Sequence, residues 1–326
     1  MTAEERKVAD FLNLSQPSEY DFSSYSASDR YKVLKGLERF MVYKASAGDF
    51  NEVYENASKK FVKLKAEGYF KGLCDPDSGC ALLQIIYRLL WDEKHLKYCL
   101  SDKGCIKADT LNSPATTLNK LVVKSKSGES ERFKSQIESR QEMSVNYIID
   151  RYYDESDDSF KKWLSDNVFL IEYLDSYHTL GNFMPYPVGC NQIRGNGETK
   201  DYFDLALAII YNCYKTLAKN DMRHEAMIIA TRLSGSEGTH VREENFMGWL
   251  ESFGNWNTFV EKNFLSPFVE KENNNGNYGR PKELWYGHFS GKVLPEEKEE
   301  CNEYFKNATA CIKERSKLML ERLKQI

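Results

Sequence analysis

The sequence predicts a mainly α-helical protein that folds as one large domain, with a short irregular or β-hairpin element near its middle. Two observations favour this class. Apolar residues recur at helical three-four spacing, as in Tyr54, Ala57, Phe61 and Leu64. Helix-breaking residues instead gather in one segment, where six glycines and prolines fall between Gly181 and Gly197. A continuous helix is therefore excluded there.

Length and composition indicate a globular chain. It has 326 residues, of which 41% are hydrophobic and 13% aromatic, which is enough to bury a substantial core. We expect a single domain over residues 1–326. The Ser-, Lys- and Glu-rich segment from Lys124 to Arg132 is the best candidate for a boundary. It would separate an N-terminal helical part, 1–126, from a C-terminal part, 133–326, that carries a loop at 177–204.

Charge and cysteine usage narrow the function classes. The 45 basic and 49 acidic residues give a net charge of −4, which disfavours a general nucleic-acid binder. The sequence has no secretory signal in its first twenty residues and no apolar run of the ~20 residues that cross a bilayer. We therefore expect a cytoplasmic protein without a membrane partner. Its eight cysteines lack zinc-type spacing and are expected to be free thiols.

The middle of the chain changes from helix to turns and back. The apolar run Val168 to Leu174 fits a strand or a helix, and a β-hairpin could form around residues 167 to 190. Thr199 is the expected N-cap of the next helix, with Asp201 in its first turn. Leu205 to Tyr211 has almost no polar face, so this helix should run through the core.

The C-terminal part returns to helices. Phe246 to Phe264 is aromatic-rich, Glu272 to Pro281 is expected to be a polar loop, and Pro295 opens the last helix. On that helix Arg315 falls on an apolar stripe with Phe305, Ala308, Ile312 and Met319. A buried guanidinium needs a partner, and we expect Asp201 or Asp204 to provide it.

The segment from Tyr177 to Asp204 is the one dense in reactive groups. Polar loops next to a buried helix often carry function, and we take this segment as the candidate site. The alternative is an ordered connection in which Asn and Asp side chains satisfy their own backbone. The candidate residues are His178, Asn182, Asn191, Arg194, Lys200, Asp201 and Asp204, together with Arg315.

The string HTLGNFMPYPVGCNQIRGNGETKDYFDLAL resembles the signature of an uncharacterised bacterial family, with HTIGNF, an Asn, an Arg-Gly and KDYWDL. It is also similar to the HNH-type nuclease domain of GmrSD-like restriction proteins. That resemblance implies a role in phage defence and a divalent metal ion. It implies catalytic roles for His178, Asn182 and Asp201 and a metal-holding role for Asn191. The upstream His base of that motif is absent, since no His lies between His95 and His178.

Three functions stay open at this point. The first is an uncharacterised defence-related protein with a degenerate HNH-like element. The second is a non-enzymatic module that binds protein or nucleic acid through an exposed aromatic or charged patch. The third is a metal-dependent phosphodiesterase or nuclease, with Arg194, Lys200, Asp204 and Arg315 binding substrate. A small-molecule phosphohydrolase would need Arg194 and Arg315 in one pocket. Trp249, Trp256 and Trp285 could stack nucleic-acid bases or fill the core.

Overall fold

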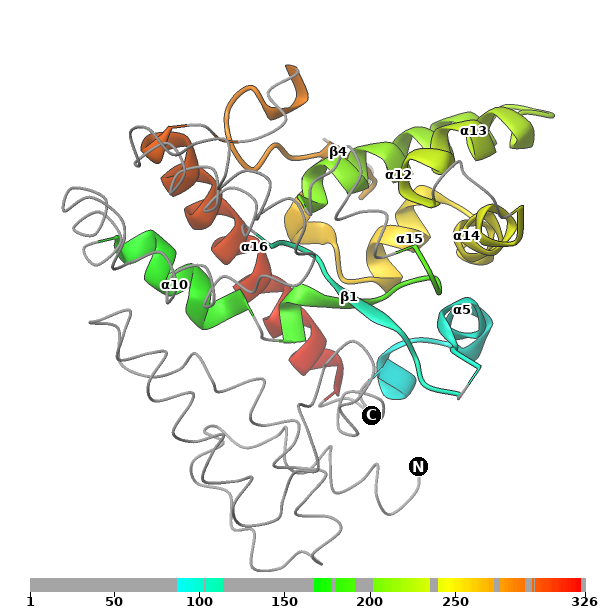
Figure 1. Ribbon diagram of the computed structural model, residues 1–326, viewed down its shortest axis with the longest axis horizontal. Coiled ribbons are helices and arrows are strands. Elements are labelled where there is room, and N and C mark those ends of the chain that lie inside the picture. Colours follow the sequence, from blue (N-terminus) through cyan, green and yellow to red (C-terminus); the bar gives the residue numbers. More distant parts are fainter. Residues whose placement is uncertain are drawn as a thin grey trace, which may run out of the picture.

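The computed structural model describes residues 87–102, 104–113, 167–177, 180–190, 202–234, 240–272, 276–290, 295 and 297–323. Helices dominate this part of the chain, and two small antiparallel sheets accompany them (Figure 1). The mainly α class is therefore confirmed for the described residues. Short helical elements on the N-terminal side are α5 (Glu93–Leu96) and η3 (Lys97–Cys99).

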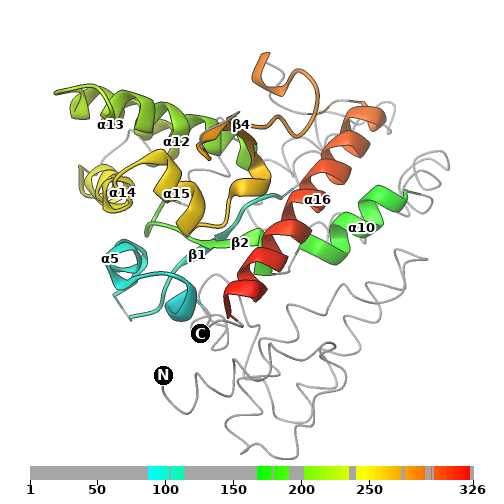
Figure 2. The same cartoon turned by 180° about the vertical axis from the view of Figure 1, so that it is seen from behind.

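One layer consists of two long helices packed side by side, α10 (Val168–Tyr177) and α16 (Lys298–Leu323) (Figures 1 and 2). The ambiguous apolar run from Val168 is thus helical. Asn167 precedes it and accepts a hydrogen bond from the Leu170 backbone N–H at 3.0 Å. The two helices meet through aromatic rings, with the Tyr173 and Phe305 centroids 5.4 Å apart.

The second group contains α12 (Phe203–Leu217), α13 (Arg223–Ser234), α14 (His240–Ser252) and α15 (Trp256–Lys262). Residues on most of α12 are buried, as its sequence predicts. The predicted N-cap is wrong, because the cap position is Tyr202 rather than Thr199. The aromatic stretch after Phe246 forms two helices, since Gly254, with φ +79°, ends the first and Asn255 caps the second.

The sheet between these groups joins distant parts of the chain. Strand β1 (Ala108–Thr110) pairs antiparallel with β2 (Phe183–Pro185), which follows η4 (Leu180–Asn182). The predicted hairpin within residues 167 to 190 is therefore wrong. Strand β2 lies among the polar turns of the mid-chain segment, and its partner strand, β1, comes from residues 108–110. Both views place β1 and β2 between the α10–α16 pair and the α12–α15 group (Figures 1 and 2).

A true hairpin lies further along, where the sequence predicted a polar loop. Strand β3 (Val269–Lys271) follows η5 (Ser266–Phe268) and pairs antiparallel with β4 (Tyr278–Pro281). Its exposed residues are polar, which hides the strand signal, while Val269, Gly279 and Pro281 are buried. The chain then passes through η6 (His288–Ser290) into α16, which begins at Lys298 rather than at Pro295.

Candidate functional site: an anchored aromatic loop beside α12

The structure describes Asn182, Asp204 and Arg315 among the predicted site residues. All are buried, with exposed fractions of 0%, 1% and 0%. The other candidates, His178, Asn191, Arg194, Lys200 and Asp201, lie outside the described residues. The contacts of Asn182, Asp204 and Arg315 indicate what these three residues do.

Asn182 is hydrogen-bonded to Asn112, which follows β1. Its side-chain oxygen accepts from the Asn112 backbone N–H at 3.1 Å, and its amide donates to the Asn112 carbonyl at 3.1 Å. The Asn182 carbonyl accepts from the Leu111 N–H at 2.7 Å. Buried backbone groups must be paired, so this pair of asparagines locks η4 against the end of β1. In these contacts Asn182 has a structural role.

Asn112 extends this lock to the helices. Its carbonyl accepts from the Tyr173 hydroxyl at 2.7 Å. Its side-chain oxygen lies 3.4 Å from the Phe203 N–H and 3.3 Å from the Tyr304 hydroxyl, both of which donate to it. One buried asparagine, through its backbone carbonyl and its side-chain oxygen, therefore joins the start of α12 to α10 and α16. It also fixes the two described ends of the mid-chain segment to one point of the core.

Arg315 is held by carbonyl oxygens, and the expected ion pair with Asp204 is not formed. Its Nη1 donates to Gly181 at 2.7 Å and to Phe183 at 2.8 Å, and its Nε donates to Asn263 at 3.0 Å. Burial lowers the pKa of Arg315 to about 9. Among the described residues, carbonyl oxygens from η4, β2 and the end of α15 bind the guanidinium on this side of α16. Asp201, the other expected partner, lies outside the described residues.

Asp204 contacts a histidine that sequence reasoning did not single out. Its Oδ2 accepts from His288 Nδ1 at 2.5 Å and from the Leu284 backbone N–H at 3.0 Å. His288 is 2% exposed, and among the described residues its Nε2 has no hydrogen-bond partner. The first turn of α12 thus holds the loop of residues 283–290, hereafter the 283–290 loop. The pairing spans 84 residues, so no local sequence pattern announces it.

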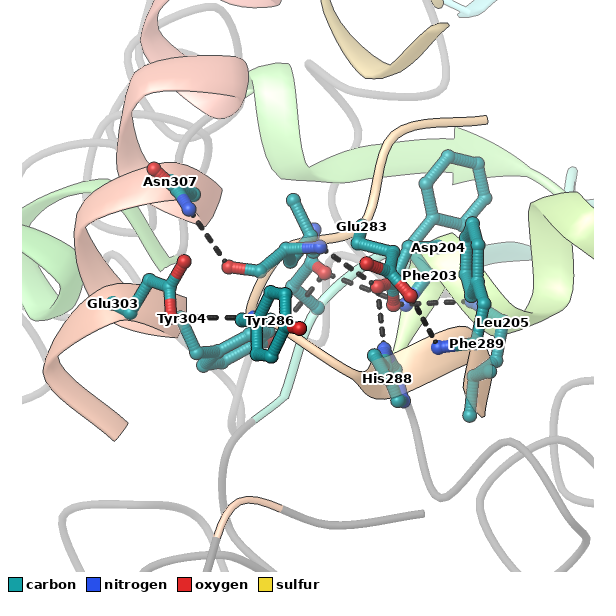
Figure 3. A network of polar contacts seen from close by, with 12 residues as sticks. Phe203, Asp204, Leu205, Glu283, Tyr286, His288, Phe289, Glu303, Tyr304 and Asn307 are labelled. Atoms are coloured by element: carbon teal, nitrogen blue, oxygen red, sulfur yellow. Dashed lines mark hydrogen bonds and ion pairs between the residues drawn. The ribbon is translucent and has the colours of Figure 1, made fainter. Parts of the chain in front are cut away.

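Further bonds hold the 283–290 loop from both sides (Figure 3). The Tyr286 N–H donates to Glu303 on α16 at 3.2 Å, and the Phe289 N–H donates to Glu283 at 2.6 Å. The Asn307 amide donates to the Leu284 carbonyl at 2.9 Å. Within the loop, the Trp285 and His288 rings stack with both side chains buried. The loop is therefore rigidly attached to α12 and α16.

The same loop presents aromatic side chains to solvent. Tyr286 is 83% exposed and Phe289 is 38% exposed, while Trp285 and His288, which precede them in the chain, are buried. Gly287, with φ +84°, makes the turn that reverses direction between them. Of the two roles open to Trp249, Trp256 and Trp285, filling the core is confirmed and base stacking is not, because all three are buried. The exposed aromatic surface is made by Tyr286 and Phe289 instead.

The described residues contain no candidate metal site. Within them, no group of three or more His, Cys, Asp or Glu side chains could hold a metal ion. The described cysteines are free, and burial raises the pKa of Cys190 and Cys213 to about 12.

Within the described ranges, no helix combines the length and apolar character that a membrane crossing needs. The chain matches no family model, no curated protein and no solved structure.

Proposed function

We propose that this protein is a binding module that docks onto a partner protein through the 283–290 loop. The observation that carries the proposal is Tyr286, a large aromatic residue that is 83% exposed on a loop fixed by hydrogen bonds to Asp204, Glu303 and Asn307. Exposed aromatics on a preorganised backbone lose little conformational entropy on binding, and tyrosine is enriched among the residues that dominate interface energies.

The contacts of the predicted site residues support binding over catalysis. Asn182 and Arg315 hold backbone groups of the core, and Asp204 holds the 283–290 loop. Each of these buried side chains is used in supporting the structure around the mid-chain segment. This arrangement suits a scaffold that positions a recognition surface. A defence role, implied by the resemblance to restriction proteins, would then be exercised through the partner.

The charges near the loop favour a protein partner over a nucleic acid. Glu283 and Glu303 carry exposed carboxylates beside Tyr286, and Lys282 donates its ammonium to the Pro267 carbonyl at 2.9 Å. A phosphate backbone would be repelled by this surface, since nucleic-acid affinity depends on free cations. The expected partner offers an apolar cleft for the tyrosine ring, rimmed by Lys or Arg side chains.

The test compares wild type with Tyr286→Ala and with a matched control, Ile228→Ala, which removes an apolar side chain that is 57% exposed on α13. Proteins captured by each variant are quantified by mass spectrometry, and the partner is then purified and titrated. We expect Tyr286→Ala to weaken the affinity about thirtyfold, the effect of losing about 2 kcal/mol. Ile228→Ala should bind as wild type, and affinity should fall with rising salt.

Two outcomes would overturn the proposal. One is a partner that binds Tyr286→Ala as tightly as wild type. The other is cleavage of DNA or RNA by the purified protein that needs a divalent ion and is lost in His178→Ala, which would establish the nuclease alternative. Thermal unfolding of Tyr286→Ala should match wild type, because the side chain is almost fully solvated.

A further inference from the structure

We infer a second binding site, for a neutral saccharide, in the depression between the end of α12, the start of α15 and the β3–β4 hairpin. It lies on other elements than the 283–290 loop and takes a ligand of a different class. The depression has a volume of about 400 Å³. Pockets of this size bind ligands as large as a mono- or disaccharide. Its lining combines aromatic rings, amides and one charge of each sign.

The aromatic part of the site is held in place by its own hydrogen bonds. Trp256 Nε1 donates to the Tyr278 carbonyl at 3.1 Å and to the Gly279 carbonyl at 3.0 Å, which fixes the indole against β4. The Tyr211 and Trp256 centroids are 5.0 Å apart with planes at 59°. Tyr211 and Tyr278 are half-buried, so part of each ring faces the depression. Such surfaces pack against the apolar C–H faces of sugar rings.

Three asparagines supply hydrogen-bonding groups at fixed positions. Asn257 donates to the Asn277 side-chain oxygen at 2.8 Å and accepts from the Tyr278 N–H at 3.0 Å. Asn255 accepts from the Thr258 N–H at 2.9 Å. The oxygens of Asn255 and Asn277 accept these bonds, and within the described part of the chain their NH₂ groups donate to no protein atom, so they can donate to a ligand. Sugar hydroxyl groups accept and donate such bonds equally well.

The charges and the ring geometry of the depression disfavour nucleotides and flat bases as ligands. Lys215 and Glu272 both line it, and the Lys215 ammonium lies 5.5 Å from the Tyr211 ring centroid. One cation and one carboxylate among the lining residues give no net charge to hold a phosphate, which disfavours nucleotides. The tilted rings of Tyr211 and Trp256 form no parallel slot for a flat base. A neutral, hydroxyl-rich ligand with one apolar face fits both observations.

The phenol of Tyr278 adds a further donor. Its hydroxyl is protonated at neutral pH, as for any tyrosine, and burial and the nearby carboxylate of Glu261 raise its pKa further. Glu272 is exposed and also lines the depression, where its carboxylate oxygens can accept hydrogen bonds. Asn255, Asn277, Tyr278 and Glu272 therefore line one depression together with the aromatic rings. This mixture of donors and acceptors matches a set of vicinal hydroxyls.

The test measures binding of the full chain to maltose, cellobiose, lactose, mannobiose and di-N-acetylchitobiose by saturation-transfer NMR, followed by titration calorimetry. Adenosine serves as the flat, uncharged competitor. We expect saturable binding of at least one disaccharide and none of adenosine. Asn277→Ala, an exposed change that spares the fold, should weaken it about tenfold, and Tyr211→Ala should do the same or more. Tyr286→Ala serves as a control and should bind as wild type.

Three results would each overturn the inference. These are no saturable binding of any disaccharide in the panel, adenosine binding that exceeds saccharide binding, and saccharide binding that is unchanged in both Asn277→Ala and Tyr211→Ala. The thermal unfolding of both variants is measured alongside, so that loss of binding in a folded Asn277→Ala protein reports on the site itself.

Discussion

At the scale of single residues, His95 shows how burial sets a protonation state. The ring is 1% exposed and stacks on Phe253, with centroids 3.9 Å apart. Ser252 Oγ donates to the Trp249 carbonyl at 2.6 Å, so His95 Nδ1 must be the donor in its 2.8 Å bond to Ser252. The proton gained in acid would go to Nε2, which among the described residues has no hydrogen-bond partner and lies 3.8 Å from Asp92 Oδ2, a charge that only partly offsets burial. Burial, together with Lys94, lowers the pKa of His95 to about 4.

This lowered pKa predicts acid sensitivity. Between the ordinary pKa of 6.5 and about 4, the unfolded chain binds a proton that the folded protein rejects. Stability from this residue is therefore complete above pH 6.5 and is lost as the pH falls towards 4. We expect His95→Gln to reduce the loss of unfolding free energy between pH 7 and pH 5 by about 1–2 kcal/mol.

Urea unfolding at the two pH values measures this difference. His224→Gln is the matched control, because His224 is exposed and should show the pH response of wild type. An unchanged pH response in His95→Gln would show that His95 is not the group that titrates.

At the scale of elements, Gly181 lets η4 approach α16. A Cβ at Gly181 would lie 2.1 Å from the Ile312 carbonyl oxygen and 2.8 Å from the Ser316 backbone nitrogen. The Gly181 N–H donates to Ser316 Oγ at 2.9 Å, and its carbonyl accepts from Arg315. Backbone atoms of a long helix cannot move aside cheaply, so no side chain fits at this crossing.

Gly181→Ala is therefore expected to destabilise the fold by about 2 kcal/mol or more. Gly248→Ala is the matched comparison, since a Cβ there would meet the ring of half-buried Tyr98 at 2.7 Å, a side chain that can rotate. The gain in helix propensity offsets part of that clash, so the cost should stay below about 1 kcal/mol. Equal losses in urea unfolding for the two variants would contradict the crossing argument.

The sequence predicts features whose pattern lies within one segment, and it does not predict contacts between distant segments. The burial of Arg315 was predictable, because its apolar stripe repeats along one helix. Its carbonyl partners at Gly181, Phe183 and Asn263 were not, because backbone acceptors leave no mark in the sequence. Strands β1 and β2 have three residues each, too few for an alternating pattern. Likewise, His288 joins Asp204 only through the tertiary fold.

At the scale of the whole molecule, cysteine accessibility tests the expected single domain. Cys99, Cys213 and Cys301 are buried and lie on η3, α12 and α16. Burial raises the pKa of Cys213 to about 12, so its reactive thiolate is scarce in the folded protein. If the chain unfolds as one unit, all three thiols should become reactive at the same urea concentration.

Alkylation with iodoacetamide along a urea series, read by peptide mass spectrometry, measures this. Half-buried Cys105 reports on local opening near Cys99. Labelling of Cys99 at lower urea than Cys213 and Cys301 would instead support a boundary between the parts 1–126 and 133–326.

The pair of Asn112 and Asn182 has a consequence for protein synthesis. During translation Asn112 emerges well before its partners, with Asn182 70 residues and Tyr304 192 residues behind it. Until Tyr304 leaves the ribosome, the buried amide of Asn112 lacks one of the groups that donate to it in the folded protein. For most of its synthesis, the nascent chain therefore contains the β1 segment without all of the hydrogen bonds that fix it in the folded protein. Over that interval, chaperones have the opportunity to engage it.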